Sequence, residues 1–246
     1  MLNDLQIVLS GDRADFTTNF EPAIILDEGE RYVASLINLE TLHSFPNVET
    51  GINDTFKFSE DRGVTWRTVQ FREGSYSLDN LAGVIRHATG DAALSLVPDV
   101  ASGVVEMRVN GLDLWVDFKD DATSVGPMLG FDAVVYAAGL HTSSKPVRIV
   151  KVNSILVNCD IVGNSYVDGR PQATLYSFYP AVEHGCKIVE TPFSPVWLPV
   201  VKSHIYTVRV WLTDESNRPL NLRGEKITLR LNIIKERGQN RRHARF

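Results

Sequence analysis

Hydrophobic and polar residues alternate with a period of two along most of the chain. The alternating runs are rich in Val, Ile, Thr, Trp and Phe, as is typical of half-buried β-strands. Turn-forming residues separate them at 61–63, 110–111, 168–169 and 217–219. The pattern predicts about a dozen short strands, at the spacing found in sandwiches and barrels. The clearest runs cover residues 57–60, 64–71, 104–109, 112–118, 147–157, 205–212 and 227–233.

One segment follows a helical period instead. Hydrophobic residues recur at i, i+3, i+4 and i+7 over 77–89, which predicts one amphipathic helix. A serine can cap its start and a glycine suits its end. A second, shorter helical turn is expected over 125–130. The residues that carry the helix prediction are Ser77, Leu78, Leu81, Ala82, Ile85 and Gly90.

Together these elements predict an all-β fold, a jelly roll or related β-sandwich of short antiparallel strands with the helix inserted. Asn110-Gly111 lies between two alternating runs and predicts a two-residue hairpin. Prolines at 171, 180, 192, 195 and 199 favour edge strands and sharply turning connections. The expected division is a β-rich part with the helix at 1–140, a sandwich part at 141–236 and a basic tail at 237–246. The alternative is one composite domain.

Composition places the chain among ordinary globular proteins, with 246 residues, 43% of them hydrophobic and 22% charged. The net charge is −5, which argues against a surface that coats nucleic acid. The charge is unevenly distributed, because the last twelve residues hold five basic residues and one acidic residue, a net +4. This tail is either a solubilising terminus or a segment that contacts the phosphates of a nucleic acid or an acidic partner. The arginines concerned are Arg237, Arg241, Arg242 and Arg245.

Two cysteines are too few for a disulfide framework or a four-cysteine zinc site. We expect Cys159 and Cys186 to be reduced and buried. The N-terminal residues lack the features of a signal peptide, and no apolar run reaches the ~18–20 residues of a membrane span. The expectation is a soluble protein without a membrane span, made inside the cell and not secreted.

The motifs of common enzymes are missing. There is no phosphate-binding P-loop and no dinucleotide-binding glycine pattern. Residues 163–167 begin like a nucleophile elbow but lack the closing glycine, so Ser165 is interpreted as a turn serine.

The remaining candidates for chemistry have simpler interpretations. The six histidines contain no pair at i, i+3 or i, i+4, and a catalytic pair of His184 and Cys186 is disfavoured by their closeness in sequence. The acidic pairs Asp12 and Asp15, and Asp120 and Asp121, are interpreted as solvated loop acids. We therefore expect no enzyme, no catalytic or metal-binding residues and no cofactor.

A series of motifs in chain order resembles a family of virion proteins from Maverick/Polinton-type and adintovirus-like DNA viruses. The resemblance implies a jelly-roll capsid subunit, the minor, penton-like protein, which assembles into symmetric oligomers of an icosahedral virion. A second similarity, carried by 74–76, the helix, two strands and 129–131, is to a small α+β module of phage tail and fibre proteins. The motifs of the first resemblance are LHSFPNV at 42–48, EGSY at 73–76, MLGF at 128–131, VNCDI at 157–161, SYVDG at 165–169, LYSFYP at 175–180, GCKIVETP at 185–192, LPV at 198–200 and LNLRGE at 220–225.

A capsid subunit needs loops that hold its neighbours, and two loops rich in proline and aromatic residues can supply such contacts. The implied partners are further copies of the chain, with a pentamer favoured, and other capsid proteins. The competing interpretation is that these aromatics close the ends of the sandwich. The alternative function is a non-catalytic β-sandwich recognition module that binds a carbohydrate or a receptor, with a role in virion attachment. The candidate contact residues are Phe178, Tyr179, Pro180, Phe193 and Trp197.

Overall fold

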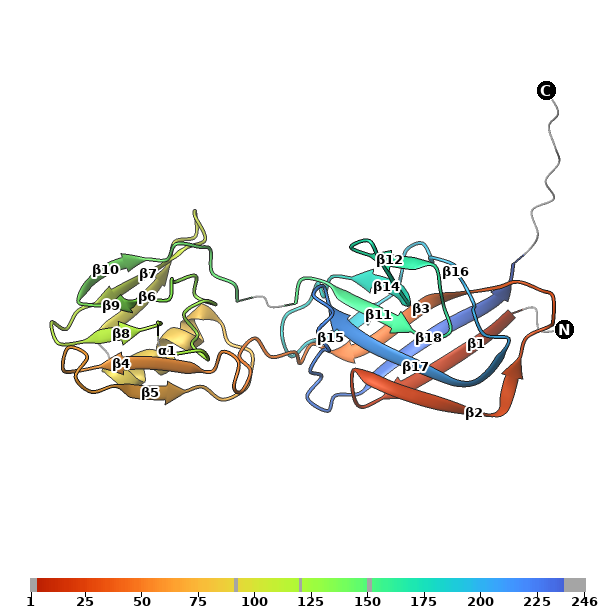
Figure 1. Ribbon diagram of the computed structural model, residues 1–246, viewed down its shortest axis with the longest axis horizontal. Coiled ribbons are helices and arrows are strands. Elements are labelled where there is room, and N and C mark those ends of the chain that lie inside the picture. The colour runs from red at the N-terminus through yellow and green to blue at the C-terminus, as the bar shows by residue number, and fades with distance from the viewer. Residues whose placement is uncertain (1–3, 91–92, 120, 150–151, 237–246) are drawn as a thin grey trace, which may run out of the picture. The chain divides into compact units, whose positions relative to one another are not determined.

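The computed structural model describes residues 4–90, 93–119, 121–149 and 152–236 (Figure 1). They form two compact units. The sandwich unit comprises the described residues of Met1–Phe45 and Val152–Phe246, and the inserted unit comprises those of Pro46–Lys151. The predicted division at 140–141 differs from this one. It falls inside strand β10 (Gly139–Thr142), which pairs with a strand within the inserted unit.

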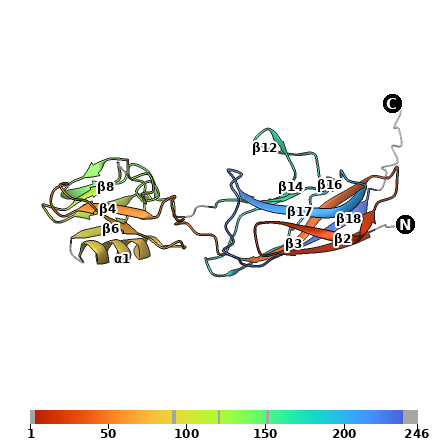
Figure 2. The same cartoon turned by 60° about the horizontal axis from the view of Figure 1, so that its bottom comes forward.

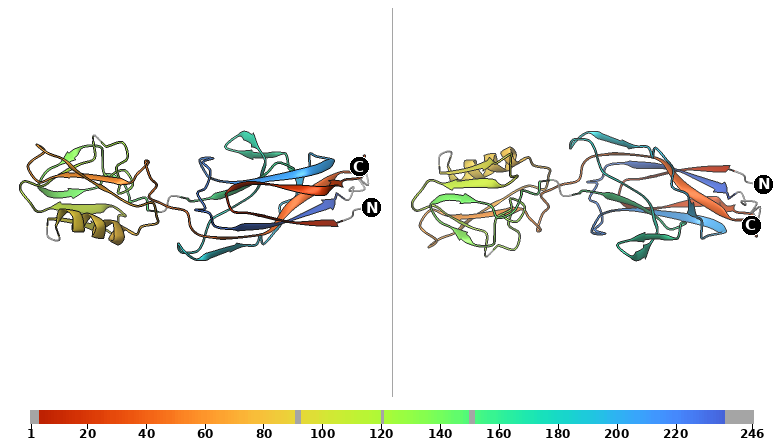
Figure 3. Two further views of the ribbon diagram at one scale, coloured as in Figure 1. Left: turned by 90° about the horizontal axis from the view of Figure 1, so that it is seen from below. Right: turned by 90° about the horizontal axis from the view of Figure 1, so that it is seen from above.

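The sandwich unit consists of two antiparallel sheets. The first has the order β1 (Asp4–Gly11), β18 (Ile227–Lys235), β3 (Tyr32–Leu42) and β15 (Lys187–Glu190), and the short β16 (Leu198–Pro199) also pairs with β3. The second has the order β14 (Thr174–Phe178), β11 (Ile155–Cys159), β17 (His204–Asp214) and β2 (Asp15–Ile25). Figure 3 shows the two sheets as stacked layers.

The connections between these strands are those of a jelly roll. The chain crosses from one sheet to the other after β1, β2 and β3, and again after β14, after β16 and after β17. Among the eight strands of the two four-strand paths, only β11 and β14 follow each other within one sheet. Such repeated crossing defines the double-sheet jelly roll, so the predicted fold class is confirmed.

Alternation explains how the sandwich closes. Residues of β18 that point inward, such as Ile227, Leu229 and Leu231, are fully buried, while their neighbours in sequence are polar. The core between the sheets contains only residues of the sandwich unit, from Ile7 to Ile233.

The register places the connections to the inserted unit at one end of the sandwich. Asp4 pairs with Ile234, and Tyr32 pairs with Lys235, so the start of β1 and the end of β18 share one end. The end of β3 at Leu42 lies at the other end, where β18 begins. The chain therefore leaves the sandwich from the end opposite to the start of β1.

The inserted unit has two small sheets and one helix. One sheet has the order β5 (Arg67–Gln70), β4 (Thr55–Ser59), β8 (Trp115–Asp117) and β9 (Val135–Tyr136). The other has the order β10, β7 (Val105–Val109) and β6 (Leu94–Pro98). Helix α1 (Leu78–Thr89) packs against β6, and β4 and β8 lie beyond β6 in Figure 2. This unit has its own core, from Val48 to Phe131.

The predicted helix is confirmed to within a residue. Ser77 caps it by accepting a hydrogen bond from the Asn80 amide at 3.1 Å, and Gly90 ends it with a φ of 94°. The buried side chains Leu81, Ala82 and Ile85 are those of the predicted stripe. Over 125–130 there is a single turn, closed by the Leu129 amide donating to the Val125 carbonyl at 3.1 Å.

Two local predictions are wrong. Asn110-Gly111 does not join a hairpin, because β7 pairs with β6 and β10 while β8 belongs to the other sheet. Of the run at 147–157, the described residues before Ile155 are not in a strand, and β11 begins at Ile155. The hairpin at Asp168-Gly169 does form, between β12 (Ser165–Val167) and β13 (Arg170–Gln172), with positive φ at both turn residues. Pro199 lies in the edge strand β16, where a residue without an amide hydrogen is tolerated.

Candidate functional site

The sandwich unit has two side walls, where the edges of its two sheets meet. On one side the edge strands are β1 and β2, which contact each other; we call this the β2 wall. On the other side the edges are β14 in one sheet and β15 with β16 in the other; we call this the β14 wall. Since edge strands carry unpaired backbone groups, the walls are the places where another chain can add.

The β14 wall carries three of the predicted contact residues on its surface. Tyr179 follows β14 directly and is exposed. Phe193 and Trp197 belong to the connection from β15 to β16, where Phe193 is fully exposed and Trp197 is 38% exposed. Transfer of an exposed aromatic ring from water into an interface is favourable. The exposed rings therefore mark the connection from β15 to β16 as a candidate contact surface.

The other two predicted contact residues lie inside the subunit. Phe178 is 8% exposed and belongs to the sandwich core, where its ring stacks with Tyr176 at 6.3 Å between centroids. Pro180 is also buried. Phe178 and Pro180 are therefore buried within the subunit, which is the arrangement of the competing interpretation, where residues of this region close the end of the sandwich.

Sequence reasoning missed further exposed residues of the same wall. Tyr166 on the β12–β13 hairpin is 70% exposed, and Val196 and Val189 are also exposed. Tyr166 and Val196 line a hollow of about 500 Å³ over β11 and β14. The signal for Tyr166 was its place in an alternating strand next to Asp168-Gly169, but sequence alone does not say which face of a hairpin is covered.

Tyr176 lines this hollow, and its hydroxyl group is hydrogen-bonded to a glutamate. Its hydroxyl donates to Glu190 Oε1 at 2.9 Å, which ties β14 to β15 across the wall. Burial raises the pKa of Tyr176, and the Glu190 carboxylate adds to this effect. The hydroxyl therefore stays protonated and the tie persists at neutral pH.

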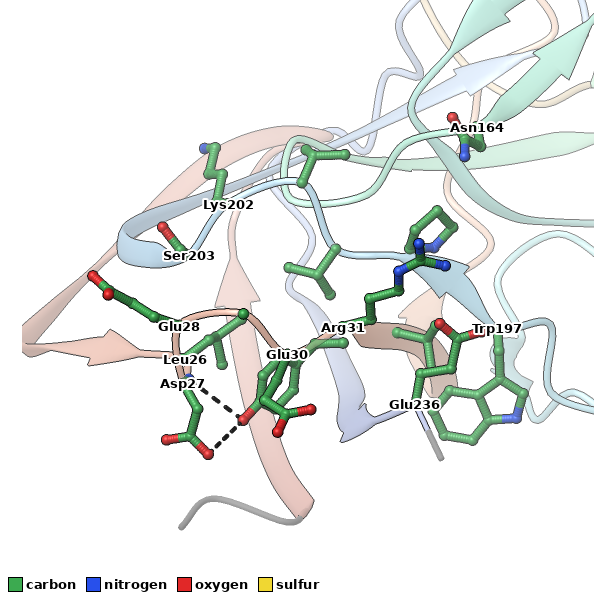
Figure 4. A pocket seen from close by; sticks show the side chains of 16 residues that line it. Leu26, Asp27, Glu28, Glu30, Arg31, Asn164, Trp197, Lys202, Ser203 and Glu236 are labelled. Atoms are coloured by element: carbon green, nitrogen blue, oxygen red, sulfur yellow. Dashed lines mark hydrogen bonds between the residues drawn. The ribbon is translucent and has the colours of Figure 1, made fainter. Parts of the chain in front are cut away.

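A second, larger hollow of about 810 Å³ lies near the end of β18 (Figure 4). Its acidic side chains are those of Asp27, Glu28, Glu30 and Glu236, and its basic ones are those of Arg31 and Lys202. Several of the acids are already engaged. Tyr32 donates to Asp27 Oδ2 at 3.1 Å, and Lys235 pairs with Glu30 at 2.8 Å, which raises the pKa of Lys235. The predicted tail residues Arg237, Arg241, Arg242 and Arg245 lie outside the described residues.

The residues considered for chemistry have structural partners. Ser165 is not in a turn but opens β12, where its hydroxyl donates to the Gln172 carbonyl at 2.5 Å and accepts from the Thr174 amide at 2.8 Å. The turn prediction is therefore wrong, because the hairpin turn lies three residues later. His184 lies 5.8 Å from the His43 ring, and its pKa is lowered by burial and by that neighbour.

The acidic pairs predicted to be solvated are partly engaged. Asp15 binds Arg209 by two hydrogen bonds, which lowers the pKa of Asp15. Asp121 accepts from the Thr55 hydroxyl at 2.6 Å, and Asp120 lies outside the described residues. Within 4–90, 93–119, 121–149 and 152–236, no three acidic, histidine or cysteine side chains gather as metal ligands would.

Both cysteines are free thiols, as predicted, but they differ in exposure. Cys159 is buried, and burial raises its pKa to about 12. Cys186 is exposed, so the prediction of two buried thiols is wrong for this residue. It lies before β15 in a turn that is tied by backbone hydrogen bonds to His43, which keeps the segment on the surface. Among the described residues, no helix is long and apolar enough to cross a membrane.

The strand order and the edges together define a jelly-roll protein whose side walls differ from each other. No protein-family model matches the chain, and no curated protein matches it. Among solved structures, the chain is similar to the crystal structure of the selenomethionine-labelled mavirus penton protein. The two are 11% identical, with a TM-score of 0.49, and the match covers 95% of this chain and 99% of that chain.

Proposed function

We propose that this chain is a structural subunit of a viral capsid, without enzymatic activity, that forms closed rings of five at the vertices of the shell. The observation that carries the proposal is the jelly-roll unit with a fully exposed Phe193 and its apolar neighbours on one side wall. A fold alone does not fix a function, so the argument rests on this surface. The virion-protein motifs of the sequence support the same conclusion.

The two walls suit a ring that closes by unlike contacts. In a cyclic oligomer larger than a dimer, one patch of each subunit meets a different patch of the next. The β14 wall supplies aromatic side chains, and the β2 wall supplies the exposed Val8 and Ile25. The connections to the inserted unit leave from an end of the sandwich and not from the middle of either wall. The two walls offer the unlike patches that such a ring requires.

The remaining parts of the proposal concern partners. Other capsid proteins would surround the ring in the shell. The arginines at 237, 241, 242 and 245 would contact genome DNA from inside it, since clustered arginines bind phosphates without reading sequence.

The direct test is the solution mass of the purified full chain. We expect light scattering at two concentrations and two salt levels to show a discrete pentamer that dissociates on dilution. High salt should leave it intact, because apolar burial is not screened as ion pairs are. A strict monomer at high concentration, in both salts, would refute ring formation by the chain alone.

A further inference from the structure

The outer face of the β5-β4-β8-β9 sheet of the inserted unit carries large side chains that do not belong to the core of this unit. Phe56, Phe58 and Val116 point into the core of this unit. The register places Lys57 opposite Thr68 and Asp117, and Ser59 opposite Trp115, all on the other face. Helix α1 packs on the second sheet, at β6, so it does not cover this face (Figure 2).

Two tryptophans meet on this face. A Cβ atom at Gly63 would lie 3.1 Å from Cε3 of Trp115 and 3.2 Å from Cζ2 of Trp66, so both indole rings approach one point. Both side chains are half-buried, and neither belongs to the core of the inserted unit. The ammonium of Lys57 lies 5.2 Å from the centroid of the Trp66 ring, within the range of a cation–π contact.

The loop before Trp66 is held by its own hydrogen bonds, and Trp115 is held as the first residue of β8. Asp61 accepts from the Ser59 hydroxyl at 2.7 Å and from the Thr65 amide and hydroxyl at 2.8 and 2.6 Å. These hydrogen bonds lower the pKa of Asp61 to about 2, so it stays ionised. Arg62 joins this loop to the loop before β8, because its Nε donates to Asp113 at 2.6 Å. A pre-formed surface binds with a smaller loss of conformational entropy.

The charges around the tryptophans are matched. Each basic side chain has an acidic partner: Lys57 with Asp117 at 2.9 Å, Arg62 with Asp113 at 2.6 Å, and Arg67 with Glu60 at 2.8 Å. Asp61 adds a further negative charge. An anionic ligand would find no unmatched cation here, whereas a neutral ligand rich in hydroxyl groups would find both donors and acceptors.

We infer that this tryptophan face binds a neutral hexose oligosaccharide. The C–H bonds on one side of a pyranose ring form an apolar surface that stacks on an indole ring, and the ring hydroxyls need polar partners around it. Trp66 and Trp115 supply the stacking surfaces, and Thr68 and the ion pairs supply the polar rim. This recognition is additional to assembly, since all of these residues belong to the inserted unit.

The test uses the full chain on an array of neutral oligosaccharides: maltohexaose, cellohexaose, laminarihexaose and N-acetyllactosamine, each beside a sialylated or sulfated oligosaccharide. We expect binding to at least one neutral member and none to the anionic ones. Calorimetry on the bound member should give affinities about tenfold weaker for Trp66→Ala and for Trp115→Ala. Trp211→Ala, which changes a half-buried tryptophan of β17 in the sandwich unit, is the matched control and should bind as the wild type does.

A second variant keeps the inference testable if the alanine variants fail to fold. Thr68→Arg adds a long side chain on the exposed outer face and removes nothing from the core, so it should block binding while the melting temperature stays the same. Absence of binding to every neutral oligosaccharide, binding to anionic ones only, or full affinity in Thr68→Arg and both alanine variants would each overturn the inference. The solution mass of these variants should equal that of the wild type.

Discussion

Replacing Phe193 by serine should weaken ring formation without harming the subunit. Phe193 is fully exposed in the isolated chain, so the substitution removes no packing within the subunit. The cost to subunit stability should stay within about 0.5 kcal/mol, as for other surface changes. Any larger effect must therefore come from contacts with a neighbour.

The size of the effect follows from burial and ring geometry. Burying a Phe side chain contributes roughly 1.5–3 kcal/mol, and we take about 2 kcal/mol for one contact. A closed ring of five repeats the contact at each interface, so the loss is about 10 kcal/mol per ring. Five chains associate in four steps, and the concentration of half-assembly therefore rises by the fourth root of the change in equilibrium constant, about 70-fold.

The assay is the mass of wild type and Phe193→Ser by light scattering over a dilution series. Val100→Ser is the matched control, because Val100 is 92% exposed and belongs to the inserted unit. It should follow the wild-type curve. If Phe193→Ser also follows the wild-type curve while the wild type assembles, the β14 wall is not the contact and the reasoning fails.

Three further predictions concern the backbone, the thiols and the tail. Gly130→Ala should lower the stability of the inserted unit by about 3 kcal/mol or more, because φ is 84° and the new Cβ would lie 2.0 Å from the Lys145 carbonyl oxygen; an unchanged urea transition would contradict this. A thiol reagent at pH 8 should modify one cysteine per native chain, Cys186, and reach Cys159 only in denaturant, because burial raises the pKa of Cys159 to about 12; two fast thiols would disprove it. Changing the four arginines of 237–246 to glutamine should reduce the salt slope of DNA binding by up to about 3.6, and an equal slope would make the tail a solubilising terminus.

The fold class and the helix could be predicted because both depend on local periodicity. The stripe of Leu81, Ala82 and Ile85 is read along one segment, and so is the alternation in β18. Strand pairing is not local. Asn110-Gly111 has the chemistry of a hairpin, yet the strands on either side find their partners in different sheets. A turn motif in the sequence predicts that the chain changes direction. Which strands then pair depends on how their hydrophobic side chains pack in the core.

The sequence identified the aromatic loops of the candidate site, but it did not show which of their side chains are exposed. Aromatic residues near prolines indicate a contact loop, but the same pattern fits a plug of the core. Phe178 and Phe193 were indistinguishable in sequence, and burial separates them. Trp66 and Trp115 were not recognised as a pair, because they are brought together by the register of β4 with β8 and by the Arg62–Asp113 tie.

The separation of the two cores would allow one chain to combine the proposed assembly with the proposed recognition. Among the described residues, none of the sandwich core comes from 46–151, and none of the second core comes from outside that range. Substitutions at distant sites without shared partners have nearly additive effects on stability. A change at Trp66 or Thr68 can therefore alter the ligand while the packing behind Phe193 is kept. The long connection between β3 and β11 holds a unit with its own core, so the recognition proposed for that unit and the assembly proposed for the sandwich use separate residues.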